Sequence, residues 1–340
     1  MVRVGVAGLG FMGRVHFKNY KALDNVELVA VCDSDRTRLE GTAGVAGNVP
    51  GGEEPLDFTG IETFDDFDKM LAAAKLDAVS IALPTYLHSH FTVKALDAGL
   101  NVLCEKPMAL DIQQCEKMIT AAEKAGKILQ IGHCIRFWPE YAKTKELVDL
   151  GQYGRVKAAS FRRLSLTPAW SSEGWLMSGA KSGGAIIDLH IHDSDYIQYL
   201  LGMPKSVRSF GVKGPSGEFD HVITNYIYDD TNKVISAEGG WIMSPSFGFE
   251  MSFNIILEEA TIVFDSTRKP AFRLCPVEGE PFTPELEKQD GYSREIEHFI
   301  RSVQGEKVSE VLTPKQSLDS IRLVLAEKES AQKAKEVTIQ

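Results

Sequence analysis

The chain has 340 residues, of which 44% are apolar and 25% charged, values typical of a globular protein with about two domains of roughly 150 residues each. Its 37 Lys and Arg against 47 Asp and Glu give a formal net charge of −10. This balance argues against nucleic acid or an anionic membrane as the main partner, because both attract clustered positive charge. No apolar run is long enough to span a membrane, the first residues lack the order of a signal peptide, and the five cysteines form no CxxC pair. We therefore expect a cytoplasmic protein without structural disulfides.

The first part of the chain, from residue 1 to about residue 125, alternates short β-rich runs with stretches of helical spacing. Apolar, β-branched runs predict buried strands at Val2–Ala7, Leu28–Cys32, Asp77–Leu83 and Asn101–Cys104, with a last strand at Ile128–Ile131. Helices are predicted at Phe67–Ala74 and Phe91–Ala98, and from a capping box at Asp111 and Gln114 to about Lys124. This alternation predicts an α/β domain over residues 1–125, a doubly wound parallel sheet of the Rossmann type.

The loop after the first predicted strand carries a GxGxxG motif made of Gly8, Gly10 and Gly13, with Phe11 and Met12 inside it. Gly8 permits the tight turn, Gly10 lets the backbone approach a pyrophosphate, and Gly13 allows close packing of helix on strand. Asp33 ends the second strand, where a carboxylate binds the ribose hydroxyls of NAD and repels the 2′-phosphate of NADP. We therefore predict an NAD site, with NADP less favoured; the alternative is a plain βα turn with a solvated aspartate.

Two polar segments follow neighbouring strands of this sheet. Pro84 to His88, with Thr85 between them, comes after Asp77–Leu83, and Glu105-Lys106-Pro107 comes after the next strand. Ligands of doubly wound sheets bind at the carboxyl edge, where both segments are expected. A lysine held there places a cation beside a nicotinamide or a substrate hydroxyl, although each segment alone is also typical of an ordinary loop.

After residue 125 the pattern changes to strands in close succession, separated by turn signals. The predicted strands are Arg155–Leu164, Ser206–Val212, Val222–Tyr228, Lys233–Trp241, Phe249–Leu257 and Ala260–Phe264. Helices are fewer, at about Pro139–Leu150, Ala185–Leu201, Tyr292–Ser302 and Pro314–Lys335. This pattern predicts an α+β domain over residues 126–340, with a large, mainly antiparallel open sheet flanked by helices.

The predicted helix Ala185–Leu201 follows a pair of glycines and carries a concentrated polar motif. Asp188, His192 and Asp195 lie at positions i, i+4 and i+7 and so share one face, whereas His190 points away from it. A carboxylate one turn from an imidazole can fix its tautomer and favour its protonated form, which suits a base that receives an alcohol proton. The alternative is a polar helix face whose histidine is merely hydrogen-bonded.

Together these residues closely resemble the Gfo/Idh/MocA family, which includes glucose–fructose oxidoreductase and inositol dehydrogenase. The resemblance extends from residue 1 to about residue 335 and rests on GLGFMG, Asp33, the Pro84–His88 segment, Glu105-Lys106-Pro107 and GGAIIDLHIHDSD. It implies an NAD-dependent oxidoreductase with the nicotinamide between two domains, acting on a secondary alcohol of a sugar or inositol-type polyol, or on the matching ketone. It also implies a homodimer or homotetramer that pairs through the open face of the second sheet.

The resemblance assigns roles to individual residues as well. It implies that Lys106 hydrogen-bonds the reacting hydroxyl, that His192 is the general base, and that Asp188 orients His192 or binds substrate. It implies that Thr85, His88 and Glu105 line the nicotinamide side of the cofactor, and that Pro84 and Lys106 are also among the cofactor-binding residues. Phe11 and Met12 are expected near the cofactor through backbone proximity.

Several residues have weaker claims. His133, Arg136, Trp175 and Tyr292 are candidates for substrate contact, although a partly buried tryptophan is more typical of a core or rim. No metal is predicted at the paired histidines His190 and His192, because positions i and i+2 of a helix diverge.

Two alternative functions stay open. One is an NADP-linked reductase of a keto-sugar or cyclic diol, since Arg36 and Arg38 lie close to Asp33 in the sequence. The other is a non-catalytic regulator that binds the dinucleotide on the same fold. The combination of Lys106, Asp188 and His192 argues against the regulator, because a binding module has no use for all three.

Overall fold

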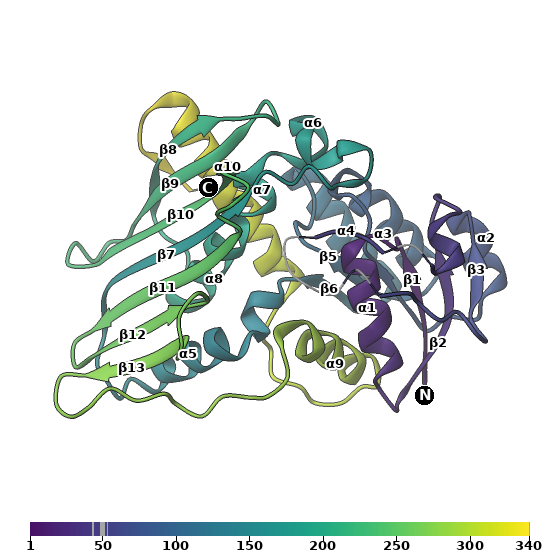
Figure 1. Cartoon of the computed structure of the whole chain (residues 1–340), viewed down its shortest axis with the longest axis horizontal. Coiled ribbons are helices and arrows are strands. Elements are labelled where there is room, and N and C mark those ends of the chain that lie inside the picture. The colour runs from purple at the N-terminus through teal and green to yellow at the C-terminus, as the bar shows by residue number, and fades with distance from the viewer. Residues whose placement is uncertain (43, 48–51, 53, 340) are drawn as a thin grey trace. The chain divides into compact units, whose positions relative to one another are not determined.

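The computed structural model describes residues 1–339 except residues 43, 48–51 and 53, and it divides the chain into two compact units (Figure 1). Unit 1 comprises Met1–Cys134, Trp170–Trp175 and Gly291–Leu318; unit 2 comprises Ile135–Ala169, Leu176–Asp290 and Asp319–Gln340. This division differs from the predicted boundary between residues 125 and 126. The strand Leu129–Gly132 and the helix Gly291–Val303 both lie beyond residue 125 and belong to unit 1.

The sheet of unit 1 has six parallel strands in the order β3-β2-β1-β4-β5-β6. The strands are β1 (Val2–Ala7), β2 (Val26–Cys32), β3 (Glu62–Phe64), β4 (Ala78–Ile81), β5 (Asn101–Glu105) and β6 (Leu129–Gly132). The predicted doubly wound parallel sheet is therefore confirmed. The strand order reverses between β1 and β4, and ligands of such sheets bind outside the carboxyl ends of the strands at this switch point. Strand β3 was not predicted, because three edge residues carry no apolar run.

The helices of unit 1 are α1 (Phe11–Lys21), α2 (Phe67–Ala73), α3 (His88–Asp97), α4 (Ile112–Ala125) and α9 (Gly291–Val303). Asp111 caps α4 by accepting the backbone N–H of Gln114 at 2.8 Å, and the Gln114 side chain donates back to its carboxylate at 2.6 Å. This reciprocal pair confirms the predicted start of α4. Gly126 ends the helix in the left-handed conformation.

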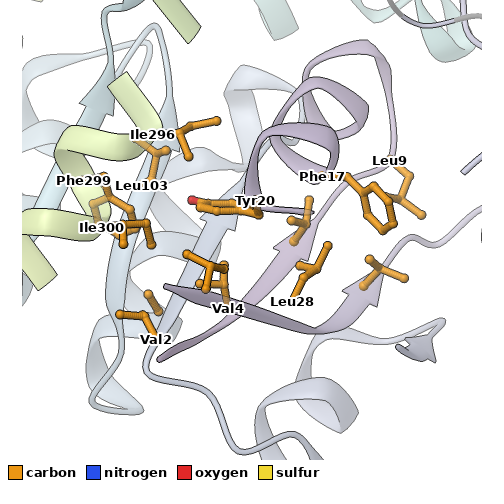
Figure 2. Packing of buried hydrophobic residues seen from close by; sticks show 14 of the residues in the cluster. Val2, Val4, Leu9, Phe17, Tyr20, Leu28, Leu103, Ile296, Phe299 and Ile300 are labelled. Atoms are coloured by element: carbon orange, nitrogen blue, oxygen red, sulfur yellow. The ribbon is translucent and has the colours of Figure 1, made fainter. Parts of the chain in front are cut away.

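Helix α9 completes the core of unit 1. Its residues Ile296, Phe299 and Ile300 recur at helical spacing, are fully buried, and join one cluster with Tyr20 of α1 and Leu103 of β5 (Figure 2). The predicted helix at Tyr292–Ser302 therefore exists, but its assignment to the second domain was wrong. Amphipathic spacing shows that a helix has an apolar face, not which sheet that face covers.

The sheet of unit 2 has eight strands in the order β13-β12-β11-β7-β10-β9-β8-β14, with β7 and β10 parallel and the other described pairs antiparallel. The strands are β7 (Val156–Leu166), β8 (Ser206–Lys213), β9 (Phe219–Ile227), β10 (Val234–Met243), β11 (Phe249–Leu257), β12 (Ala260–Asp265), β13 (Phe272–Pro276) and β14 (Val337–Thr338). This arrangement confirms the predicted large, mainly antiparallel sheet. The two strands at its edges, β13 and β14, were not predicted.

The remaining helices are α5 (Pro139–Leu150), α6 (Gly179–Ser182), α7 (Ala185–Asp188), α8 (Ile191–Leu201) and α10 (Pro314–Lys333). Helices α5, α8 and α10 lie on one face of the sheet of unit 2, and the other face is open (Figure 1). Burial alternates along β9 accordingly, with Val222 and Thr224 buried and Ile223 exposed. In the part of the chain that the structure describes, no helix combines the length and apolar character needed to cross a membrane.

Candidate functional site

The glycine motif forms the turn between β1 and α1. Gly8 has a φ of 90°, and a β-carbon there would collide with the carbonyl of Ala82; a β-carbon at Gly13 would collide with the carbonyl of Gly8. At Gly10, the N-cap of α1, the nearest atom to such a carbon would be Nη1 of Arg38 at 4.0 Å. Two glycines are thus required by close backbone packing, and the third leaves room above the start of α1. That shape fits a dinucleotide pyrophosphate at a helix N-terminus.

Asp33 follows β2 and is 6% exposed. Its Oδ2 accepts the backbone N–H of Leu9 at 2.7 Å and lies 3.3 Å from Nη1 of Arg38, and its Oδ1 accepts the N–H of Asp35 at 2.9 Å. A carboxylate offers about four acceptor positions, so one position stays available to a ribose hydroxyl. Asp33 therefore both closes the glycine turn and fits the predicted contact with an adenosine ribose.

Phe11 and Met12 begin α1 and are half-buried. The ring of Phe11 lies against Gly47 and Gly52, where a β-carbon on Gly52 would stand 3.0 Å from Cδ2 of Phe11. The long segment between β2 and β3 thus contacts the glycine motif. Direct contact of either side chain with the cofactor stays a prediction.

The segments after β4 and β5 are joined by His88, which begins α3 and is 1% exposed. Its Nε2 lies 2.7 Å from the carbonyl of Leu83 and its Nδ1 lies 2.8 Å from that of Pro107. A neutral imidazole donates from one nitrogen, so only the protonated ring donates to both carbonyls. Burial lowers the pKa of His88, whereas the two carbonyls and Glu105 act in the opposite direction. His88 therefore shapes both segments, and its contact with the cofactor stays a prediction.

Pro84 is the N-cap of a single 3-10 turn, Thr85–Leu87, that precedes α3. Thr85 is 1% exposed, and its hydroxyl has no hydrogen-bond partner among the described residues. A buried hydroxyl without a partner is costly in a protein interior. This position therefore fits a polar contact to a bound ligand.

A buried polar chain supports Glu105, the last residue of β5. The Glu105 Oε1 lies 2.9 Å from Nε2 of His16, and the other ring nitrogen of His16 lies 3.0 Å from the hydroxyl of Ser80. Burial alone would raise the pKa of Glu105, but the hydrogen bond and charge of His16, together with Lys106 and His88, bring it below its usual value. The other oxygen of Glu105, Oε2, accepts the backbone N–H of Lys106 at 3.2 Å.

The polar motif of unit 2 lies on two short helices rather than on the single helix predicted. Helix α7 ends at Asp188 and α8 begins at Ile191, with Leu189 and His190 at the junction. From Ser182 to Ile197, every residue is buried except Asp188 and His192, which are half-buried. The structure thus leaves these two candidate residues accessible in an otherwise closed segment.

Asp195 is not part of that accessible pair. It is fully buried, its oxygens accept Nε and Nη2 of Arg136 at 2.9 and 2.8 Å, and it also accepts the hydroxyl of Ser320 at 2.6 Å. Asp193, also buried, binds Arg163 of β7 in the same two-pronged manner at 2.9 and 3.0 Å. The predicted single helix that carries Asp188, His192 and Asp195 is therefore broken after Asp188, and Asp195 is buried in the core by its contacts with Arg136 and Ser320.

Two family models match this chain. A family model described as "Oxidoreductase family, NAD-binding Rossmann fold" matches residues 2–133, and the model for the GFO/IDH/MocA C-terminal domain matches residues 141–263. The chain belongs to the Gfo/Idh/MocA family. It is accordingly an oxidoreductase with an NAD-binding Rossmann domain, as the residues of the glycine motif predicted.

Relatives within the family cover nearly the whole chain. A D-glucoside 3-dehydrogenase of Escherichia coli (strain K12) is 30% identical over 331 residues, covering 90% of this chain and 89% of the relative. A scyllo-inositol 2-dehydrogenase (NAD(+)) of Bacillus subtilis (strain 168) is 28% identical over 319 residues, covering 90% and 87%. The crystal structure of the WlbA dehydrogenase from Bordetella pertussis, in complex with NADH and UDP-GlcNAcA, has a TM-score of 0.82, 21% identity and coverage of 100% and 99%. At this identity the structural likeness shows the shared fold alone.

The four candidates for substrate contact are buried or half-buried. His133 is 1% exposed, directly after β6, and Arg136 is held by Asp195 with its guanidinium 4.5 Å from the ring centre of Tyr199. Trp175 and Tyr292 are half-buried. Contact of these four side chains with substrate stays a prediction. Among the described residues, no group of three or more His, Cys, Asp and Glu side chains is arranged to hold a metal ion.

Proposed function

We propose that this oxidoreductase uses NAD to oxidise a secondary alcohol of a sugar or of a cyclic, inositol-type polyol, or to reduce the matching ketone. The observation that carries the proposal is the burial pattern of the segment from Ser182 to Ile197, in which Asp188 and His192 alone are accessible. An imidazole and a carboxylate kept accessible on a rigid buried scaffold suit proton transfer. The names of the two dehydrogenase relatives, one for a glucoside and one for an inositol, support the substrate class.

In the proposed reaction, His192 accepts the proton of the substrate hydroxyl while the C–H bond of the same carbon gives up a hydride and the carbonyl forms. The cofactor, when bound, supplies the hydride acceptor. Lys106 stabilises the negative charge that develops on the substrate oxygen, and Asp188 orients His192 or binds a neighbouring hydroxyl. The side chain of Glu105 accepts the backbone N–H of Lys106 and so fixes the start of the segment that carries this lysine.

The test is nicotinamide reduction followed by absorbance, with NAD and NADP separately, over a panel of inositols, aldoses, sugar acids and their nucleotide-linked forms. We expect turnover with at least one polyol or sugar, preferring NAD, together with the reverse reaction on the matching ketone. Turnover in neither direction, by a protein that demonstrably binds NAD, would overturn the dehydrogenase proposal and favour the regulator.

Asp33 provides a prediction about cofactor choice. Replacing Asp33 with asparagine removes the charge that accepts ribose hydroxyls and leaves Arg38 beside the same position. A charged hydrogen bond contributes about 1.5–3 kcal/mol, so we expect the KM for NAD to rise about 10–10²-fold while the KM for NADP changes little or falls. Steady-state kinetics with both cofactors measure the effect.

Asp57→Asn is the matched control, since Asp57 is an exposed carboxylate between β2 and β3 that binds Thr59 rather than Arg38. This variant is expected to keep the NAD preference of the unaltered protein. An Asp33→Asn protein whose ratio of NAD to NADP efficiency is unchanged would contradict the assignment of Asp33.

We further propose a homodimer or homotetramer formed through the open face of the sheet of unit 2. Phe210 of β8 and Ile223 of β9 are paired in register there and are 56% and 44% exposed, and Val212 is 56% exposed. Large apolar side chains gathered on one exposed face mark interaction surfaces. Phe210→Glu is expected to lower the molar mass measured by light scattering to that of a smaller assembly.

The control for this variant is Leu150→Glu, because Leu150 is 66% exposed at the end of α5, away from the open face. It should leave the measured mass unchanged. A wild-type protein that is monomeric at micromolar concentration would refute the proposed assembly.

A further inference from the structure

The residue that joins α7 to α8 is His190, and it lies between the two accessible residues of the segment. Asp188 precedes it by two positions and His192 follows it by two. The backbone N–H of His190 donates to the carbonyl of Ala185 at 2.8 Å, and its own carbonyl accepts the N–H groups of Asp193 and Ser194 at 3.1 and 3.2 Å. His190 therefore ends one helix and caps the next, so its placement sets the angle between them.

The side chain of His190 is fixed by Glu327 of α10. Its Nε2 lies 2.9 Å from Oε2 of Glu327, both side chains are fully buried, and the hydroxyl of Tyr226 lies 3.3 Å from the same nitrogen. The second oxygen of Glu327 accepts the hydroxyl of Ser194 at 2.9 Å. One buried carboxylate thus holds the junction residue and a residue of the first turn of α8.

The sheet beneath this pair is shaped to receive the imidazole. A β-carbon on Gly239 of β10 would collide with Nδ1 of His190 and would lie 2.9 Å from its Cβ. Thr224 of β9 adds a weaker bond to Glu327 at 3.3 Å. Residues of α8, α10, β9 and β10 therefore converge on one ring and one carboxylate.

A buried polar pair such as His190 and Glu327 is not explained by stability alone. Well-packed apolar residues of the same volume are often as stable, whereas a fully bonded polar cluster admits one arrangement of its elements. We propose that Glu327 is a positioning residue: through His190 and Ser194 it fixes the α7–α8 junction and thereby the directions in which Asp188 and His192 point. This inference rests on the proposed function, in which those two residues carry the proton transfer.

The test is Glu327→Gln, which keeps the volume but replaces one of the two carboxylate oxygens that bind His190 and Ser194 with an amide nitrogen. A shift of about 1 Å in a catalytic group can lower turnover about 10²-fold, so we expect kcat to fall about 10–10²-fold with the KM for NAD unchanged. The imidazole pKa of His192, followed by NMR on isotope-labelled histidine and assigned with His192→Ala, is expected to move as well. This second readout requires neither substrate nor turnover.

Ser330→Ala is the matched control, because Ser330 is also buried on α10 but binds the backbone of Ser209 and Lys335 rather than the junction. Urea unfolding should show a loss of stability in both variants, with kcat and the His192 titration changed in Glu327→Gln alone. If Glu327→Gln fails to fold, Ser194→Ala removes one bond to the same carboxylate and is expected to show the same changes at smaller size.

Two outcomes distinguish a failure of the positioning role of Glu327 from a failure of the proposed dehydrogenase function. If His192→Ala abolishes turnover while Glu327→Gln keeps the wild-type kcat and His192 titration, the positioning role is overturned and the dehydrogenase stands. If His192→Ala keeps full turnover, the proposed function fails, and the His192 titration alone then decides whether Glu327 positions the junction. Equal losses of kcat in Glu327→Gln and Ser330→Ala at equal losses of stability would also overturn the positioning role.

Discussion

His192→Ala is expected to lower kcat by about 10²–10⁴-fold, the range that general acid–base catalysis contributes. The structure leaves His192 half-buried at the start of α8 while the neighbouring residues on both sides are buried. Without a base, the hydroxyl proton must pass to water as the hydride leaves. The measurement is kcat at saturating NAD and substrate, together with the pH profile of kcat/KM, in which the limb that reports the base should disappear.

The control for His192 is His90→Ala, since His90 is an exposed histidine on α3 of unit 1. It should keep wild-type kcat and pH profile. NAD affinity should be unchanged in both variants, because neither residue belongs to the glycine motif. A His192→Ala enzyme with nearly full turnover at every pH would remove the assignment of the base.

The features that the sequence predicted well depend on residues close together in the chain. Gly13 is required because its backbone approaches that of Gly8 within one βα turn, and the capping box joins Asp111 to Gln114 within a single helical turn. The alternation of strands and helices before residue 125, and the closely spaced strands after it, likewise predicted the character of the two sheets. Such local patterns are visible without knowledge of tertiary partners.

The features that were missed depend on distant partners. A glutamate at position 327, in the middle of a predicted helix, is usually solvated, and its burial follows from His190, far away in the chain. His16 likewise gives no signal on its own, because its partners Ser80 and Glu105 come from β4 and β5. Asp188 and His192 were predicted as site residues on one helix, but the break at Leu189 and His190 was not predicted, since helical spacing continues across it.

Lys106→Met is the second change with a large expected effect. Removing one group that stabilises developing negative charge typically costs about 10²–10³-fold in kcat, and a methionine keeps most of the lysine's apolar stem without its charge. The substitution leaves Glu105 in place, and Glu105 still accepts the backbone N–H of residue 106. The segment after β5 should therefore keep its conformation. We expect kcat to fall by this factor, with NADH affinity, measured by fluorescence titration, within about threefold of wild type.

Two further variants, Lys106→Arg and Lys117→Met, distinguish loss of the charge at position 106 from a general effect of replacing a lysine. Arginine keeps the positive charge but not the compact ammonium, so partial recovery of kcat is expected if the charge itself stabilises the alkoxide. Lys117 is an exposed lysine on α4, and its replacement should leave kcat unchanged. If Lys106→Met instead raised the KM for NAD and left kcat intact, Lys106 would be a cofactor contact without a part in the chemistry. In that case His192 alone would carry the charge changes of alcohol oxidation.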